Sequence, residues 1–290
     1  SVIVAEAKPS VGRKLLMAGK SGLNLTKAEA PEDFLAAYEE AAPVLAPMIA
    51  AFGPAEVRAW AEGLGQAVFT GSTGRVFPKV MKASPLLRAW LARLDGMGVT
   101  VRTRWRWTGW RDGAAVFGTP QGEQVVAADA TVLAMGGASW ARLGSDGAWA
   151  ERFDTAPFRA ANVGIAVDWS ERMAEQFGAP VKAVALSAGG RVTRGECVIT
   201  ARGLEGAGVY AISRALRDGA PLTVDLMPDL TVERLRDKLG RRRRGDSLSS
   251  HLRRTVRLDP AKRSLLMEFG RPLPVDLAPL MKALPVRYAE

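Results

Sequence analysis

The first residues that could do chemistry stand at the front of the chain, where the apolar run VIVAE ends on an acid, Glu6. A loop rich in basic and small residues follows, with Arg13, Lys14, Gly19 and Gly22. In a nucleotide-binding β-α-β unit, an acid at this place accepts hydrogen bonds from the ribose hydroxyls. Basic side chains could meet pyrophosphate charge, and glycines let backbone N–H groups approach a ligand. The stretch indicates a nucleotide site, and it also fits a polar loop after an edge strand.

Two further segments add candidates for the same kind of site. The segment DATVLAMGGAS, residues 129–139, predicts an apolar strand that runs into Gly136 and Gly137. That position corresponds to the sheet edge where open α/β sheets bind ligands. The glycine-rich loop TGSTGRVFP, residues 70–78, carries Arg75, whose guanidinium could hold an anionic group of a substrate or cofactor. A plain turn for the glycine pair and a solvated side chain for Arg75 are the alternatives.

The residue pattern predicts the elements that would position these candidates. Residues 2–6 are typical of a buried parallel strand, and residues 81–98 of an amphipathic helix that ends at glycine. Helical spacing between residues 31 and 65 is broken by Pro and Gly, and residues 99–135 predict a series of strands. A helix is expected around Ala148–Phe153. Beyond Pro157 the composition shifts to further strands and to a charged helical segment at 231–267.

Length and composition limit the classes of protein. A chain of 290 residues suggests about two domains, and 48% hydrophobic with 24% charged residues is ordinary for a soluble globular protein. The sequence lacks an apolar run of about 18 residues, so we expect no membrane association. The net charge of +10 favours anionic partners. The single Cys197 excludes an intrachain disulfide and fits the cytoplasm, and one Cys with one His predicts no metal site.

A dense basic segment runs from Arg241 to Arg263. Such a run is usually a solvated helical face, and the alternative is a surface that binds RNA or a nucleotide. Aromatic residues do not interleave with these arginines, which weakens an interpretation as a single-stranded RNA site. Within or near the segment, His251 is predicted to be a surface residue and Cys197, in the apolar run ECVIT, a buried one. The basic residues are Arg241, Arg242, Arg243, Arg244, Arg253, Arg254, Arg257, Lys262 and Arg263.

Four motifs in order carry a resemblance to a known family. They are GRKLLMAGKSGLNLT, GSTGRVFPKVMKASPLLRAWLARL, VLAMGGASWARLGSDGAW and GECVITARGLEGAGVYAISR, and together they extend over most of the chain. The sequence resembles the BaiN/RdsA-like bacterial flavoproteins, which are NAD(P)/FAD-dependent oxidoreductases. It is most similar to the subgroup with a GLNLT loop. Gly22 and Leu23 stand where other members have Arg and Cys, so a catalytic role based on that Arg or Cys does not transfer.

The resemblance implies an α/β fold in which an incomplete Rossmann-like FAD-binding domain is interrupted by an inserted domain. The FAD-binding domain would span residues 1–157, the inserted mixed β and helical domain residues 158–282, and the return to the first domain would start at 283–290. Family members have an N-terminal GxGxxG turn and a C-terminal glycine-rich region. The expectation is therefore a chain truncated at both ends, which by itself binds FAD poorly and is inactive.

The resemblance also implies roles for individual residues. Glu6 would bind the adenosine ribose, Arg13 and Lys14 would lie along the cofactor, and the segment from Gly19 to Asn24 would pass near the flavin. Arg75 and Lys20 are the candidates for anchoring substrate or tuning the charge of the flavin. The expected cofactor-binding residues are Glu6, Arg13, Lys14, Gly19, Lys20, Ser21, Gly22, Asn24, Gly136 and Gly137.

The expected activity is that of an FAD-dependent oxidoreductase of the bacterial cytoplasm. Hydride would pass from NAD(P)H through the flavin to a small unsaturated or carbonyl substrate. Two alternatives stay open. One is a flavoprotein that binds RNA or the ribosome and reduces uracil in ribosomal RNA, and the other is a non-catalytic basic binding module.

Overall fold

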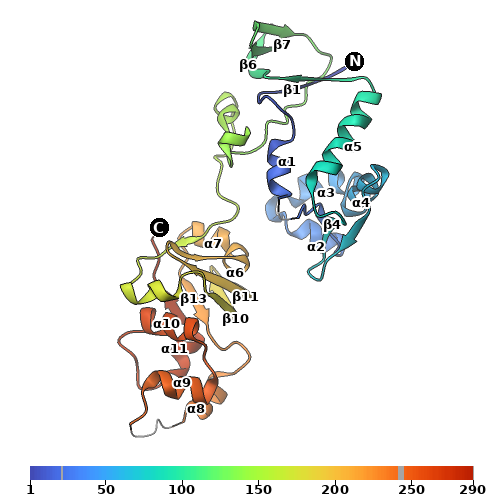
Figure 1. The fold of residues 1–290 in the computed structure, drawn as a ribbon. Coiled ribbons are helices and arrows are strands. Elements are labelled where there is room, and N and C mark those ends of the chain that lie inside the picture. The colour runs from blue at the N-terminus through green and yellow to red at the C-terminus, as the bar shows by residue number, and fades with distance from the viewer. Residues whose placement is uncertain (21, 241–244, 290) are drawn as a thin grey trace. The chain divides into compact units, whose positions relative to one another are not determined.

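The computed structural model describes residues 1–20, 22–240 and 245–289. Predictions that concern Ser21, Arg241–Arg244 and Glu290 therefore lie outside the described residues. The chain forms two compact units, unit 1 (Ser1–Phe158) and unit 2 (Arg159–Glu290), and each combines helices with sheets (Figure 1).

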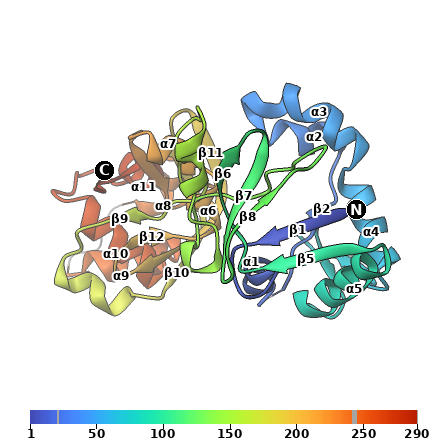
Figure 2. The ribbon, with the colours of Figure 1, turned by 90° about the horizontal axis from the view of Figure 1, so that it is seen from above.

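The described residues of unit 1 form three small sheets. Strands β1 and β5 are a parallel pair in which Val2 lies opposite Val99 and Glu6 opposite Thr103, and Figure 2 shows the two strands side by side. The other two sheets are antiparallel, in the orders β2-β4-β3 and β6-β7-β8. The strands are β1 (Val2–Glu6), β2 (Thr26–Lys27), β3 (Val68–Thr70), β4 (Arg75–Pro78), β5 (Val99–Thr103), β6 (Arg106–Arg111), β7 (Ala114–Thr119) and β8 (Gly122–Val126).

Helices of unit 1 begin where the local chemistry favours a helix start. Pro31 and Pro54 occupy first helical positions, where the missing N–H group costs no hydrogen bond. The side chain of Glu56 accepts a hydrogen bond from the N–H of Gly53 at 2.9 Å. This contact caps the N-terminus of the helix that begins at Pro54. The helices are α1 (Arg13–Ala18), α2 (Pro31–Ala36), α3 (Ala42–Ala51), α4 (Pro54–Gly63) and α5 (Ala83–Gly96), with 3-10 helices η1 (Glu39–Ala41), η2 (Ala141–Leu143) and η3 (Ala148–Arg152).

One predicted strand is absent and one predicted helix has a different type. Residues 129–135 are not in a strand, and the side chain of Val132 is 88% exposed. The apolar composition of this segment gives it a high β propensity, but a strand also needs a neighbour for its backbone hydrogen bonds. The helix predicted around residues 148–153 is the 3-10 helix η3. The helix predicted at 81–98 is confirmed as α5, and the strands predicted before residue 127 are present. Strand β1 is parallel as predicted, but it is largely exposed rather than buried.

Unit 2 is built on one antiparallel sheet, in the order β14-β13-β10-β11-β12-β9. The described end of the chain belongs to this sheet, because β14 pairs with β13 and Ala289 bridges to Ala166. The strands are β9 (Ile165–Ala166), β10 (Pro180–Ala188), β11 (Arg191–Thr200), β12 (Gly203–Glu205), β13 (Leu222–Asp225) and β14 (Leu284–Val286).

Capping side chains start the larger helices of unit 2. Thr231, Ser247 and Asp259 each accept a hydrogen bond from the backbone N–H three residues later, as N-cap residues do. The helices are α6 (Ala207–Tyr210), α7 (Ser213–Arg217), α8 (Val232–Leu239), α9 (Leu248–Val256), α10 (Pro260–Phe269) and α11 (Ala278–Lys282), with the 3-10 helix η4 (Glu171–Gln176).

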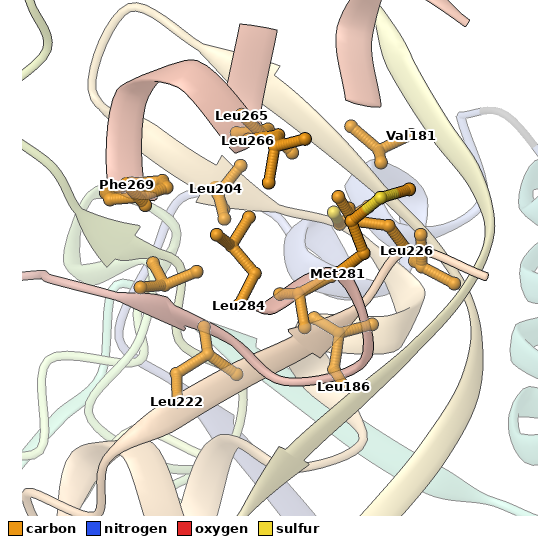
Figure 3. Packing of buried hydrophobic residues seen from close by; sticks show 14 of the residues in the cluster. Val181, Leu186, Leu204, Leu222, Leu226, Leu265, Leu266, Phe269, Met281 and Leu284 are labelled. Atoms are coloured by element: carbon orange, nitrogen blue, oxygen red, sulfur yellow. The ribbon is translucent and has the colours of Figure 1, made fainter. Parts of the chain in front are cut away.

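The core of unit 2 is the larger of the two. Figure 3 shows side chains from the sheet, such as Leu186 and Leu222, in one cluster with Leu265, Leu266 and Phe269 of α10. The core of unit 1 is a small cluster beneath α4 and α5. It consists of Leu23, Ala61, Leu64, Val68, Val76, Ala83 and Leu86.

Candidate functional site

Glu6 lies at the carboxyl end of β1, where the chain leaves the parallel pair. Its Oε1 atom accepts a hydrogen bond from the N–H of Lys8 at 2.7 Å. Two backbone hydrogen bonds hold the turn at residues 6–8 against the chain that follows β5. The carbonyl of Glu6 accepts a hydrogen bond from the N–H of Trp105 at 3.0 Å, and the carbonyl of Lys8 accepts one from the N–H of Arg104 at 3.1 Å. Among the described residues, the second carboxylate oxygen of Glu6 has no hydrogen-bond partner. This oxygen is therefore an available acceptor at the edge where α/β sheets bind ligands.

A loop of residues 136–149, here the glycine loop, passes beside Glu6. Gly136, Gly144 and Gly147 have φ angles of 76°, 109° and 72°, a region that favours glycine. A Cβ atom at Gly144 would lie 4.0 Å from Oε1 of Glu6. The indole N–H of Trp149 donates a hydrogen bond to the carbonyl of Gly136 at 2.8 Å and closes the loop.

Lys14 connects α1 to the glycine loop. Its Nζ atom donates to Oγ of Ser139 at 3.0 Å, to Oγ of Ser145 at 3.3 Å and to the carbonyl of Ser139 at 3.4 Å. Ser145 is buried, and its hydroxyl lies where a side chain at Gly136 would collide with it. The sequence prediction included Lys14 and Gly136 but missed both serines. The available signal was the run of small and hydroxyl-bearing residues directly after the glycine pair.

Arg13 is the second basic residue at this end of α1. One of its terminal nitrogens donates to Oγ of Ser10 at 3.3 Å. Its Nε atom is buried and has no hydrogen-bond partner. A buried donor without a partner costs free energy, and an acceptor on a ligand would remove that cost.

The other predicted site residues lie on several elements. Gly19 is buried, and a Cβ atom there would lie 2.5 Å from that of Ala83 on α5, so its small size serves helix packing. Gly22 has a φ of 126° and faces Met81. Gly137 is half-buried in the glycine loop. Lys20 and Asn24 are exposed on the segment between α1 and β2, and Arg75 is exposed at the start of β4.

These residues do not all converge on Glu6. The hydrogen bonds and ion pairs of the described residues join Lys14 to the glycine loop, but they join neither Lys20, Asn24 nor Arg75 to it. Ser21 lies outside the described residues. The structure thus gathers Glu6, Lys14, Gly136 and the missed serines into one site in unit 1.

Two predictions in unit 2 are corrected. His251 is buried rather than on the surface, because it shares the inward face of α9 with Leu252 and Val256, and its Nδ1 atom has no partner. Lys262, assigned to the basic surface, is also buried, and burial lowers its pKa. Cys197 is buried as predicted. Burial, together with the nearby charge of Glu196, raises the pKa of its thiol to about 12.

In the part of the chain that the structure describes, no helix is long and apolar enough to cross a bilayer. The same residues contain no group of three or more His, Cys, Asp or Glu side chains placed to hold a metal ion.

Two protein-family models match the chain. Residues 1–199 match the model of the HI0933-like protein Rossmann domain, and residues 159–283 match that of the HI0933-like protein barrel and H2TH domain. Residues 159–199 match both models. A search of curated proteins found no match. The Rossmann match confirms the predicted α/β fold class and nucleotide-binding type of fold. Because this match covers more than half of the sequence, the chain belongs to the HI0933-like family.

Proposed function

We propose that this chain is the core of an FAD-dependent oxidoreductase of the BaiN/RdsA-like type, in the subgroup with a GLNLT loop. Its substrate would be a small unsaturated or carbonyl compound, and NAD(P)H would be the electron donor. The Rossmann family match supports a dinucleotide ligand. The buried thiol of Cys197 fits the reducing bacterial cytoplasm that the sequence predicts for the protein.

The observation that carries this proposal is the position of Glu6 beside the glycine loop. One oxygen of its carboxylate is an available acceptor for ribose hydroxyls, and Gly144 lets the loop backbone lie close to the carboxylate and to the side chain of Lys8 because it has no side chain of its own. The unpartnered Nε–H of Arg13 and its positive charge fit a diphosphate. These residues fit the adenosine diphosphate part of FAD.

Each residue then has a distinct task. Glu6 accepts hydrogen bonds from the ribose, Arg13 contributes a charged donor, and Lys14 holds the glycine loop against α1. Bound FAD would supply the hydride transfer itself. Lys20 and Arg75 are exposed cations without an acidic partner among the described residues, which supports the proposal that they anchor an anionic group of the substrate.

The test is a titration of the 290-residue chain with FAD, followed by the quenching of flavin fluorescence. Glu6→Gln keeps the size of the side chain and removes its charge, so we expect the dissociation constant to rise about 10-fold to 100-fold. The matched control is Glu62→Gln, an exposed glutamate on α4. Equal affinities for Glu6→Gln and the control would refute the ribose-binding role.

The electron donor needs a separate measurement. Because the 290-residue chain alone is expected to be inactive, the protein expressed from its full reading frame and loaded with FAD is mixed anaerobically with NADH or NADPH, and flavin absorbance is followed. Bleaching by either nucleotide supports the proposed donor. Loaded flavin that neither nucleotide bleaches would contradict it, while the titration result for Glu6 would still stand.

Exposed arginines at the end of α9 and just after it favour RNA binding as a second candidate function. Arg253 and Arg257 are exposed without an acidic partner in the described part of the chain, whereas Arg254 pairs with Asp246 at 2.5 Å. Arg241–Arg244 lie outside the described residues. A labelled ribosomal RNA hairpin should bind, with affinity that falls steeply with salt and falls further in Arg253→Gln/Arg257→Gln. Affinity that is independent of salt and of these arginines would exclude this candidate.

A further inference from the structure

Helix α3 presents an apolar surface that unit 1 does not cover. Its sequence, APVLAPMIAA, contains no polar side chain, and none of its residues is buried. Val44 and Met48 are 67% and 60% exposed and lie one turn apart on the same face. Phe52 follows at the same spacing just after the helix and is 55% exposed. A helix that is apolar all round is normally a buried helix, so this surface needs an explanation.

The charge around this surface is opposite to that of the whole chain. The segment 28–57 contains no lysine or arginine, although the chain carries a net charge of +10. Glu32 and Asp33 are exposed in the first turn of α2, which packs against α3, and Figure 1 shows the two helices as neighbours in unit 1. The apolar stripe Val44–Met48–Phe52 therefore belongs to an acidic segment, whose carboxylates are here called the acidic border. The acids of the segment are Glu29, Glu32, Asp33, Glu39, Glu40 and Glu56.

We propose that this stripe and its acidic border form a docking surface for a basic amphipathic helix of another protein. Such a helix would place apolar side chains on Val44, Met48 and Phe52 while its cations face Glu32 and Asp33. A two-fold contact with a second copy would instead bring two acidic borders together, which costs free energy through like-charge repulsion. The proposal is independent of the FAD site, because α3 contributes no residue to it.

The experiment uses the 290-residue chain and two labelled peptides, with binding followed by fluorescence anisotropy. One is a helical amphipathic peptide of Leu and Lys, and the other has the same pattern with Glu in place of Lys. We expect the Leu/Lys peptide to bind and the Leu/Glu peptide not to bind. Val44→Ser/Met48→Ser should weaken binding by about 10-fold or more, since it removes two apolar contacts. The control is Val192→Ser, an equally exposed valine in unit 2.

A second variant tests the acidic border. Glu32→Gln/Asp33→Asn should weaken binding of the Leu/Lys peptide several-fold and reduce its dependence on salt. The proposal is overturned if both peptides bind equally, or if the Val44/Met48 variant binds as the wild type does. Sedimentation that shows a dimer of the chain, lost in the Val44/Met48 variant, would also overturn it, because a second copy would then occupy the stripe.

Discussion

At the scale of single residues, the candidate site depends on contacts between side chains and loop backbone that are far apart in sequence. Lys14 and Ser145 are separated by 131 positions, yet the ammonium group of the lysine donates hydrogen bonds to the hydroxyls of Ser145 and Ser139. Glu6 is likewise placed by its own turn, through the N–H of Lys8. Lys14 thus fixes the loop that lies beside Glu6, and in the proposed function it would act on a ligand indirectly, through this loop.

Replacing Lys14 should loosen the glycine loop. Lys14→Met removes all hydrogen bonds from this side chain to Ser139 and Ser145, and each such bond contributes about 0.5–1.5 kcal/mol. We expect hydrogen exchange of the Trp149 indole N–H, measured by NMR, to become about 5-fold to 10-fold faster. Lys14→Arg should restore part of the protection. Lys20→Met, at an exposed lysine nearby, should leave exchange unchanged, and an equal effect of both methionine variants would contradict the role of Lys14.

The thiol of Cys197 should be unreactive in the folded chain. Its pKa rises from 9.0 to about 12 on folding, so its contribution to stability is present below pH 9 and is lost as pH rises from 9 to 12. Between pH 8 and pH 10 the free energy of unfolding should fall by about 1.4 kcal/mol more in the wild type than in Cys197→Ala. Urea titrations at both pH values measure this difference. A thiol reagent that labels the folded chain at pH 8 would show that Cys197 is not protected.

At the scale of secondary-structure elements, Lys262 joins three parts of unit 2. Strand β10 has a bulge between Val181 and Val184, where Ala183 adopts a φ of 49°. From α10, the Nζ atom of Lys262 donates to the carbonyl of Ala183 at 3.0 Å and to that of Leu226, after β13, at 2.9 Å. The ammonium group satisfies the carbonyl of Ala183, which the bulge in β10 leaves without a ladder partner, and the carbonyl of Leu226 after β13.

Removing that ammonium group should destabilise unit 2. Lys262→Met keeps a long apolar side chain but leaves the buried carbonyl of Leu226 unpaired, at a cost of about 1–3 kcal/mol, and it also removes the hydrogen bond to the carbonyl of the exposed Ala183. We expect the free energy of unfolding from urea titration to fall by about 2 kcal/mol or more. Lys238→Met on α8, where the lysine is exposed, is the matched control and should change stability little. If the two variants were equally stable, Lys262 would have no such bridging role.

The same elements show what the sequence could and could not predict. Helix α5 and strands β5 to β8 follow from local periodicity and turn residues, and these predictions hold. The strand at 129–135 fails because its apolar pattern carries no information about a pairing neighbour. The burial of His251 and Lys262 depends on which helix face meets the sheet, and charge counting in a basic run cannot show that. The hydroxyl groups of Ser139 and Ser145 are visible in the sequence after the glycine pair, but nothing local shows that they contact Lys14, which lies 125 and 131 positions away.

At the scale of the whole molecule, the two units bury apolar surface very unequally. Unit 2 packs a six-stranded sheet under helices with one large core, whereas unit 1 has a small core and exposes Val2, Ile3 and Val4 along β1. Burial of apolar area is the main favourable term in folding, so we expect unit 2 to be more stable to unfolding than unit 1.

Expressed separately, residues 159–290 should therefore unfold in one cooperative transition when followed by circular dichroism. Residues 1–158 should unfold gradually and bind the apolar dye ANS, because their small core leaves β1 and its neighbours open to water. A sharp transition for residues 1–158, without dye binding, would contradict this expectation. In that case the parallel pair β1–β5 would be stable on the contacts of unit 1 alone, and the Glu6 site could be studied in the smaller piece.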